Sequence, residues 1–83
     1  MPIMDPTLIR LAVIVSAVTG TDIRRIRHAS SWNDVGADSL SRAEIFAACE
    51  REFNCELSDS ACEDLNTVGD LAALVDKAKA RAA

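Results

Sequence analysis

The sequence predicts an all-α fold, a four-helix bundle with three longer helices, one short helix and a long loop between the first two helices. Hydrophobic residues make up 49% of the 83-residue chain, which is too many for a disordered protein. Glycine and proline are scarce, with 3 and 2 residues, so a turn-rich β domain is disfavoured. Apolar residues also recur at helical spacing in several segments. A chain of this length fits a single domain over residues 1–83.

The first helix is predicted over residues 5–18. Asp5 is a good N-cap, Pro6 suits the first helical position, and Gly20 can end the helix in the left-handed conformation. The residues that can face the core are Leu8, Leu11, Ala12, Val15 and Val18. The apolar residues left over are Ile9, Val13 and Ile14. Because one helix of a small bundle hides one broad stripe, we expect either an exposed apolar patch, used by a partner or for weak self-association, or a cover formed by the long loop.

A long connection follows over residues 19–38, and its apolar residues have no sustained period. We expect these residues to tie the loop over the core, and they are Ile23, Ile26, Trp32 and Val35. The segment has room for a short helical turn around residues 23–27. Loops of this length are uncommon in compact domains unless they serve a function.

The second helix is predicted over residues 39–53, with Asp38 as its N-cap and Asn54 as its left-handed end. Its apolar residues form two adjacent stripes. One stripe consists of Leu40, Ala43 and Ala47. The other consists of Ile45, Phe46, Cys49 and Phe53.

Two further helices complete the predicted bundle. A short helix is expected over residues 59–65. The segment Thr67-Val68-Gly69-Asp70 fits a capping box, in which the first and last side chains cap each other's backbone N–H groups. The final helix is therefore predicted over residues 68–79, with Leu71, Leu74, Val75 and Ala78 as its apolar face.

The formal net charge is −4, and it is unevenly distributed along the chain. Residues 1–28 have a balance of +2, whereas residues 29–83 have a balance of −6. A nucleic acid partner is disfavoured, because neutralising phosphates requires a basic face. An acidic half instead suits basic protein partners, although a merely solvated surface would have the same composition.

The cysteines and the apolar segments indicate where the protein works. Cys49, Cys55 and Cys62 form an odd set without C-x-x-C spacing, which disfavours a disulfide framework and a metal site. Free thiols fit a reducing compartment. Residues 1–6 lack a basic segment typical of a secretory signal, and the most apolar stretch, residues 11–15, is too short to cross a bilayer. We therefore expect a cytoplasmic monomer that does not insert into membranes.

The most informative segment is Asp34-Val35-Gly36-Ala37-Asp38-Ser39-Leu40. Gly36 allows a tight backbone turn, and Asp38 caps the helix. Ser39 then occupies the first helical position, with its hydroxyl expected to be free because Asp38 already serves the backbone N–H groups. A phosphodiester at this hydroxyl would face the positive end of the helix dipole. No base lies beside Ser39 in sequence, so the residue suits modification by another enzyme better than nucleophilic catalysis.

This segment resembles the phosphopantetheine attachment motif of acyl carrier proteins, D-x-[LV]-G-x-D-S-[LM]. The likeness continues from Ala29 to Val75. It includes Ser31-Trp32 in the loop, Glu50-Arg51-Glu52-Phe53-Asn54-Cys55-Glu56-Leu57 at the exit of the second helix, and Asn66-Thr67-Val68-Gly69-Asp70-Leu71 at the start of the last helix. The first helix matches in pattern only. Three motifs in this order identify the chain as a member of the family.

The resemblance implies a carrier and not an enzyme. Ser39 would bear 4′-phosphopantetheine through a phosphodiester, and Asp38 would help the modifying synthase to recognise the site, with Gly36 and Leu40 completing the motif. Acyl groups would be held as thioesters on the terminal thiol of this arm. The cofactor would come from coenzyme A through a phosphopantetheinyl transferase, and the products would be fatty acids, polyketides or specialised lipids.

The resemblance also implies a docking face for acyl-transferring and chain-extending enzymes. Its candidate residues are Ala43, Glu44, Ala47, Glu50, Arg51, Asp59 and Glu63. This face departs from the commonest fatty-acid carriers, because Ser41 and Arg51 occupy positions that are often acidic, while Ala43 and Ala47 replace bulkier aliphatic residues. These changes favour a specialised bacterial carrier over a housekeeping one, and ordinary surface variation is the alternative.

Two other functions remain open at this point. A peptidyl carrier of nonribosomal synthesis is similar, but that family more often has Gly-Gly-[HD]-Ser, and Ala37 favours the acyl type. An unmodified helical interaction module with an acidic face is the alternative from another class. Catalysis is disfavoured, because the single histidine, His28, lies in a basic loop with Arg24, Arg25 and Arg27 and has no evident serine or cysteine partner.

Overall fold

The computed structural model describes residues 5–82, and the side chains of residues 5–80. Its elements are α1 (Pro6–Thr19), the 3₁₀ turn η1 (Ile23–Arg25), α2 (Ser39–Phe53), α3 (Asp59–Glu63) and α4 (Val68–Ala82). Within the described range, extended pairing is limited to an isolated bridge between Ser31 and Thr67. The predicted all-α bundle of three longer helices and one short helix is confirmed.

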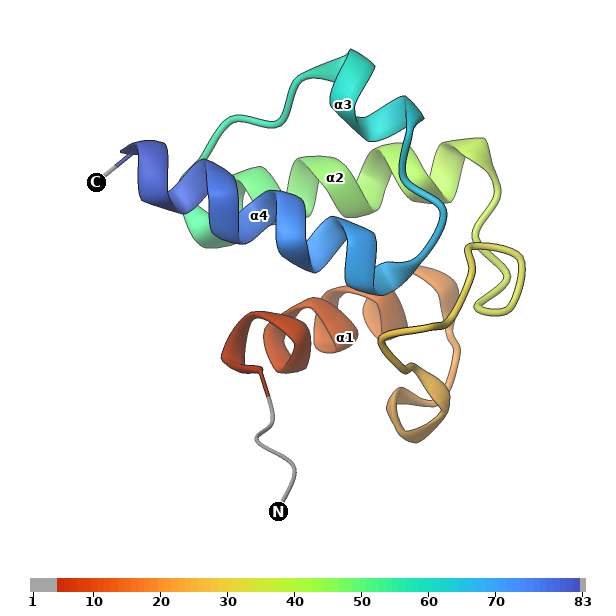
Figure 1. Ribbon diagram of the computed structural model, residues 1–83. Helices are drawn as coiled ribbons and strands as arrows, with labels where there is room; N and C mark the ends of the chain where they lie inside the picture. Colours follow the sequence, from red (N-terminus) through yellow and green to blue (C-terminus); the bar gives the residue numbers. More distant parts are fainter. Residues whose placement is uncertain (1–4, 83) are drawn as a thin grey trace.

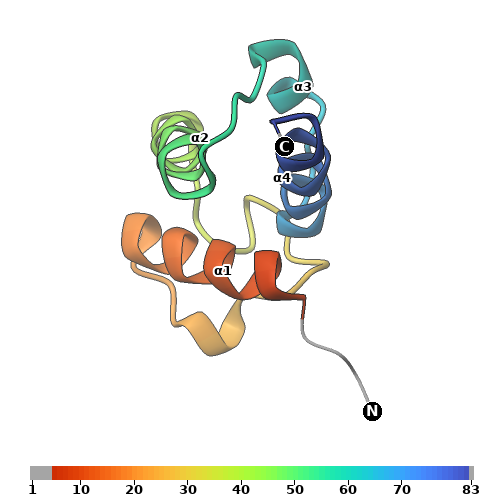
Figure 2. The ribbon, with the colours of Figure 1, turned by 90° about the vertical axis from the view of Figure 1, so that its left-hand side faces the viewer.

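The three longer helices surround a common core. Helix α1 packs against both α2 and α4, and it lies beneath them in Figures 1 and 2. Helix α3 lies at the opposite end, above α2 and α4 (Figure 2). Residues 20–38, called the long loop from here on, run along one end of the bundle from α1 to α2 (Figure 1).

The centre of the core is built from pairs of residues four positions apart. Leu11 and Val15 on α1, Ile45 and Cys49 on α2, and Leu71 and Val75 on α4 are all completely buried. Residues four apart lie one helical turn apart on the same face, so each longer helix contributes one apolar edge to the centre. Each large aliphatic side chain buried in this way contributes about 1.5–3 kcal/mol.

The predicted helix caps are confirmed. Asp5 caps α1 by accepting from the Thr7 N–H at 3.0 Å, so the helix begins one residue later than predicted. Gly20 and Asn54 have left-handed φ values of 78° and 51° and end α1 and α2. The predicted capping box is also present, because Asp70 N–H donates to Thr67 Oγ1 at 3.1 Å and Thr67 N–H donates to Asp70 Oδ2 at 3.2 Å.

Four helix ends differ from the prediction. Two of them belong to α1, which runs over Pro6–Thr19 and so begins and ends one residue later than predicted. Helix α3 ends at Glu63 and not at residue 65, because the chain turns there and presents the Leu65 carbonyl to the indole N–H of Trp32, at 3.0 Å. Helix α4 continues to Ala82, beyond the predicted end at Lys79. Its last residues are alanine, lysine and arginine, which are strong helix formers, and no glycine or proline interrupts them.

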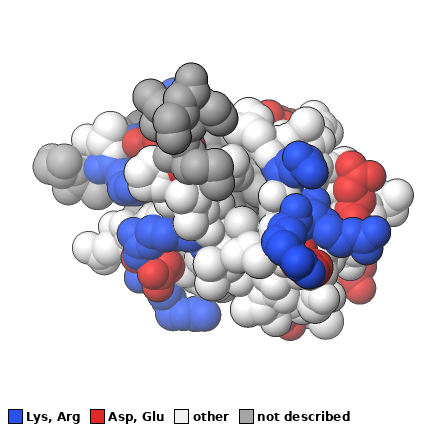
Figure 3. All heavy atoms as spheres, turned by 90° about the horizontal axis from the view of Figure 1, so that it is seen from below, with Lys and Arg blue, Asp and Glu red and all other residues white. Residues whose placement is uncertain are grey.

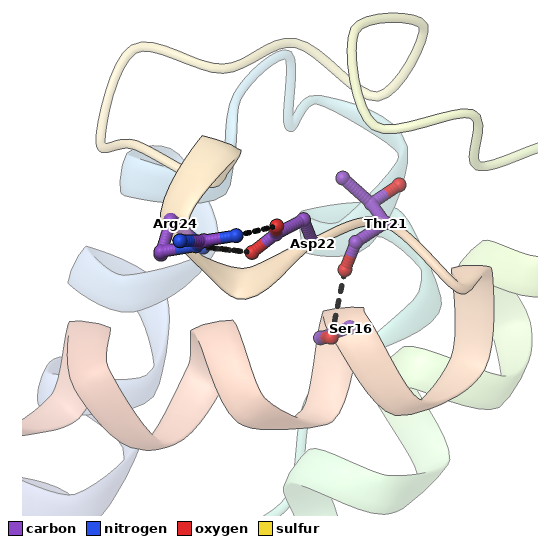
Figure 4. A network of polar contacts seen from close by, with 4 residues as sticks. All are labelled: Ser16, Thr21, Asp22 and Arg24. Atoms are coloured by element: carbon purple, nitrogen blue, oxygen red, sulfur yellow. Dashed lines mark hydrogen bonds and ion pairs between the residues drawn. The ribbon is translucent and has the colours of Figure 1, made fainter.

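The long loop is tied to the core at three of the four predicted positions. Ile26, Trp32 and Val35 are buried, with exposed fractions of 8%, 6% and 1%. The prediction for Ile23 is wrong, because this residue begins η1, none of whose residues is buried. The turn itself ends at Arg25, two residues before the predicted limit. Figure 4 shows the start of the loop, where Ser16 Oγ donates to the Thr21 carbonyl at 2.7 Å and Asp22 pairs with Arg24 at 2.8 Å.

The outer face of α1 carries the predicted apolar patch. Ile9 and Val13 are 42% and 53% exposed, so the alternative that the long loop covers them is wrong. Ile14, which was also left over by the predicted core stripe, is half-buried and packs against the core. In Figure 3, which views the molecule from below, uncharged surface separates two groups of basic side chains. The use of this patch by a partner stays a prediction.

Candidate functional site

The candidate site begins at the turn that leads into α2. Gly36 has a φ of 69°, a left-handed conformation that strains most residues with a side chain, so glycine is favoured there. The Ala37 N–H donates to the Trp32 carbonyl at 2.8 Å, and the Ala37 side chain is buried. This turn leaves Asp38, Ser39 and the following residue exposed at the end of the helix.

Asp38 acts as the helix cap that the sequence predicted. Its Oδ1 accepts from the Ser41 N–H at 2.8 Å, while its backbone is extended. The hydrogen bonds from the Ser41 backbone and then the Ser41 hydroxyl lower the pKa of the Asp38 carboxyl. Asp38 is therefore a carboxylate at neutral pH and engages the first-turn N–H groups in place of Ser39.

Ser39 is exposed at the first position of α2, but its hydroxyl is not free as the sequence predicted. Arg42 Nη2 donates to Ser39 Oγ at 3.3 Å. The prediction failed because the motif draws attention to residues before the serine, whereas Arg42 lies three residues after it. The spacing of three on a helix, which makes side chains neighbours, is the signal that could have found Arg42.

The neighbourhood of Ser39 does not activate its hydroxyl. Arg42 is a permanent cation and has no acceptor, so it cannot remove the hydroxyl proton. Within residues 5–80, no other side chain forms a hydrogen bond to Ser39 Oγ. The residue is therefore accessible and unactivated, as expected for a group that another enzyme modifies.

A shallow groove of about 240 Å³ opens beside Ser39, between α2 and α3. Its α2 side is formed by Ser39, Arg42, Ala43 and Phe46. Its α3 side is formed by Asp59, Cys62 and Glu63. A larger hollow of about 600 Å³ lies near the start of α3 and the middle of α4, but Ser39 does not line it. The groove is thus the hollow that an arm on Ser39 can enter directly.

Apart from Glu50, the predicted partner-binding residues divide into two groups. Glu44, Ala47 and Arg51 are exposed and follow helical spacing, and together with Leu40 of the attachment motif they form one outer stripe of α2. Leu40 is the most exposed large apolar residue described, at 69%. Ala43, Asp59 and Glu63 are also exposed, but they line the groove beside Ser39.

Glu50 differs from the other predicted partner-binding residues. Its side chain is half-buried, and its Oε2 accepts from the Leu57 N–H at 3.0 Å. The carboxylate therefore braces the segment that leaves α2, a role that sequence reasoning missed. The bond joins residues seven apart across a turn, and no short-range spacing rule points to it.

The remaining reactive side chains show no catalytic arrangement. Burial raises the pKa of Cys49 to about 12, and burial also raises the pKa values of Cys55 and Cys62. All three are free thiols. Across residues 5–82, no cluster of three or more His, Cys, Asp or Glu residues could hold a metal ion. In the same range, no helix combines the length and the apolarity needed to cross a membrane.

Comparisons with known proteins agree with this geometry. The family model described as "Phosphopantetheine attachment site" matches residues 10–75, most of the chain. The solved holo acyl carrier protein of Geobacter metallireducens is 35% identical, with a TM-score of 0.81, over 94% of this chain and 91% of that chain. The hexanoyl acyl carrier protein from the actinorhodin polyketide synthase of Streptomyces coelicolor is 28% identical, with a TM-score of 0.75, over 92% and 90%. The acetyl actinorhodin acyl carrier protein of the same organism is 25% identical, with a TM-score of 0.69, over 98% and 95%.

A family match over most of the chain, together with a 35% identical relative of nearly the same length, decides the classification. The solved structures named above are all acyl carriers, so the comparisons favour neither a peptidyl carrier nor an unmodified module. The chain belongs to the phosphopantetheine attachment family and is one of its acyl carrier proteins, which bear covalently attached 4′-phosphopantetheine and are carriers, not enzymes.

Proposed function

We propose that Ser39 is the attachment residue and that the chain presents acyl groups from this position to successive biosynthetic enzymes. The observation that carries the proposal is the exposed hydroxyl at the first position of α2, which the Asp38 cap leaves available for modification. A phosphodiester fits there, because a guanidinium lies within 3.3 Å of the hydroxyl and a groove opens beside it. The attached arm supplies a terminal thiol, on which an acyl group is held as a thioester.

The residues around Ser39 support this function in different ways. Asp38 fixes the start of α2, and Gly36 makes the turn that keeps the serine exposed. We propose that Asp38 and Leu40, both exposed, form part of the surface that a phosphopantetheinyl transferase recognises. Acyl-transferring and chain-extending enzymes would meet the outer stripe of α2 and the acidic residues Asp59 and Glu63.

Intact-mass spectrometry tests the attachment site. Treated with coenzyme A and a promiscuous phosphopantetheinyl transferase, the protein is expected to gain one phosphopantetheinyl group. Ser39→Ala is expected to stay folded and gain nothing, because an exposed first-turn hydroxyl contributes little to stability. Ser41→Ala is the matched control and is expected to be modified normally. Modification of Ser39→Ala, or its loss in Ser41→Ala alone, would contradict the assignment.

We propose further that the carrier serves a specialised pathway and not housekeeping fatty-acid synthesis. In the outer stripe of α2, Ala47 occupies a position from which a larger apolar side chain would enter a partner's pocket. Ala43 beside it is equally small and exposed. Arg51 places a positive charge on the same stripe, which opposes docking to a basic partner. The similarity to two polyketide carrier structures is consistent with this proposal.

A kinetic comparison tests the specialised pathway. The holo protein is expected to be a poorer substrate of a housekeeping ketosynthase than a typical fatty-acid carrier, with the largest difference at low salt. Arg51→Glu combined with Ala47→Met is expected to restore part of the rate, because a buried methionine adds roughly 1.5–3 kcal/mol of apolar contact. Equal activity of the unaltered protein, or no gain in the double variant, would contradict the proposal.

We also propose that the chain acts in the cytoplasm as a monomeric single domain. Three free thiols support a reducing compartment. The three longer helices share one core, which supports a single domain. Sedimentation of the holo protein tests the monomer, and a concentration-dependent increase in mass would contradict it.

A further inference from the structure

At the candidate site, the guanidinium of Arg42 forms no ion pair with an acidic side chain within residues 5–80. Its Nη2 contacts Ser39 Oγ, but its Nε is shielded from solvent and has no hydrogen-bond partner among the described residues. The ion pairs within residues 5–80 are Arg10–Glu52 and Arg24–Asp22, so neither Asp59 nor Glu63 across the groove pairs with Arg42. A shielded donor without a partner costs free energy, and such groups in native proteins call for an explanation.

The chemistry of an arginine in this position is specific. A guanidinium presents several N–H donors in a rigid planar fork, which matches the anionic oxygens of a phosphate better than a single hydroxyl oxygen. Arg42 lies three residues after Ser39 on the same helix, so the two side chains share one face of α2. A phosphate ester formed on Ser39 Oγ would place its anionic oxygens two bonds from the atom that Arg42 already contacts, with the phosphorus between them.

We propose that Arg42 is the residue that binds the phosphate of the arm. The inference rests on the proposed attachment at Ser39. In the modified protein the Arg42 guanidinium donates to the anionic oxygens of the phosphodiester, and its unpartnered Nε–H gains an acceptor. Because Arg42 lines the groove between α2 and α3, this contact directs the arm from Ser39 toward the groove and away from the exposed outer stripe.

The proposal has a consequence for stability that separates it from a purely structural role. If Arg42 only braced the start of α2, its replacement would change the modified and unmodified proteins equally. If Arg42 binds the phosphate, modification itself stabilises the fold, and this gain depends on Arg42. Since the pair is partly exposed, the gain is expected to be a roughly three- to tenfold decrease in the unfolding equilibrium constant.

The experiment compares the apo and holo forms of four proteins by urea unfolding at low salt: the unaltered chain, Arg42→Gln, Arg42→Lys and Arg51→Gln. Arg51 is the matched control, because it lies on the same helix but is exposed and does not line the groove. We expect modification to stabilise the unaltered chain and Arg51→Gln equally. The gain is expected to be reduced in Arg42→Lys, absent in Arg42→Gln, and weakened by salt in the unaltered chain.

A second measurement uses only the unaltered chain, so it does not depend on whether a variant can be modified. In ¹H–¹⁵N spectra, the Arg42 Nε–H resonance is expected to shift on modification, while that of Arg51 stays in place. An unshifted Arg42 resonance, or equal stabilisation of the unaltered chain and Arg42→Gln, would overturn the role of Arg42 and leave attachment at Ser39 standing. Intact mass separates the two proposals, since a chain that gains no arm at all removes both.

Discussion

Two segments near Ser39, the long loop that precedes it and helix α3 across the groove, are attached to the core in different ways. The long loop, although mostly irregular, buries Ile26, Trp32 and Val35. Its carbonyls accept hydrogen bonds from α4, because Val68 N–H donates to the Ser30 carbonyl at 2.9 Å and Gly69 N–H donates to the His28 carbonyl at 2.8 Å. Helix α3 has regular hydrogen bonds, yet none of its five residues is buried. Burial, and not regular secondary structure, therefore decides which of the two segments is firmly attached.

This difference suits a carrier. The long loop fixes the turn before α2, so Asp38 and Ser39 are presented in a defined position to the modifying enzyme. On the opposite side, α3 covers the groove with exposed and half-buried side chains, so its movement exposes little of the core. A groove between α2, which contributes to the core, and the loosely attached α3 can admit arms with different cargo at low cost.

The largest effect is expected from removing the main contact of the long loop. Trp32 is 6% exposed, packs edge-to-face on Phe46 with ring centroids 5.9 Å apart, and donates to the Leu65 carbonyl. Trp32→Ala is expected to cost about 3–5 kcal/mol, a large fraction of the roughly 5–15 kcal/mol that stabilises a typical domain. Urea unfolding followed by circular dichroism measures the loss.

Two variants serve as controls for this prediction. Trp32→Phe keeps an aromatic ring but leaves the Leu65 carbonyl without its donor, and it is expected to cost about 1–3 kcal/mol. Cys62→Ala, on the α3 wall, is expected to cost less than about 1 kcal/mol, because the side chain is only half-buried. A cost at Cys62 as large as that at Trp32 would contradict the contrast between the long loop and α3.

The native thiols provide the next test. Cys49 is completely buried on α2, and burial raises its pKa to about 12, whereas Cys62 on α3 is half-buried at the groove. Because Cys49 reacts only when the core opens, its alkylation by iodoacetamide is expected to be at least about a thousandfold slower than that of Cys62, or about 4 kcal/mol. Peptide mass spectrometry after timed labelling measures both rates, and comparable rates would mean that α3 is as firmly packed as α2.

Sequence reasoning succeeded where the signals were local. The bounds of α2 were predicted correctly because Asp38 and Asn54, at its two ends, have strong and specific cap conformations. The end of α3 was missed because it depends on Trp32, which lies 33 residues before its partner Leu65. Ile23 was misplaced because apolar character alone does not show which way a 3₁₀ turn faces.

The candidate site could be predicted in part. The turn at Gly36, the cap at Asp38 and the exposed serine follow from the order of residues in one short segment. The groove could not be predicted, because its α3 wall is placed by tertiary packing. Arg42 was within reach of the spacing rule for helical neighbours, but its shielded and unpartnered Nε is visible only in three dimensions.

A smaller effect is expected where the long loop meets α4. A Cβ at Gly69 would overlap the His28 ring, so glycine at this helical position makes room for the loop. Gly69→Ala is expected to cost about 1–2 kcal/mol, although alanine favours a helix, because the ring must move. In a His28→Ala background the same change is expected to be neutral or stabilising. Urea unfolding of the four proteins measures this coupling, and additive costs would contradict it.

The smallest effect is expected in acid, and it compares two exposed carboxylates, Asp38 at the start of α2 and Asp70 in the first turn of α4. The pKa of Asp70 is lowered, first by the bond from the Asn66 N–H and then by those from Thr67, and the pKa of Asp38 is lowered by its bonds from Ser41. A carboxylate whose pKa is lowered in the folded state stabilises the fold fully when the pH is above the ordinary pKa of the group, near 3.8. This stabilisation is lost as the pH falls through the lowered pKa.

Stability is therefore expected to be constant from neutral pH down to about pH 5 and to fall below about pH 4. Asp70→Asn and Asp38→Asn keep an oxygen acceptor but cannot ionise, so each is expected to flatten part of this fall. Because Asp38 caps α2 where the long loop ends, while Asp70 closes the turn that follows α3, their separate effects show which of these two regions unfolds first in acid. Unfolding midpoints between pH 2 and pH 6 measure this, and variants with the same acid profile as the unaltered chain would exclude both carboxylates as the cause.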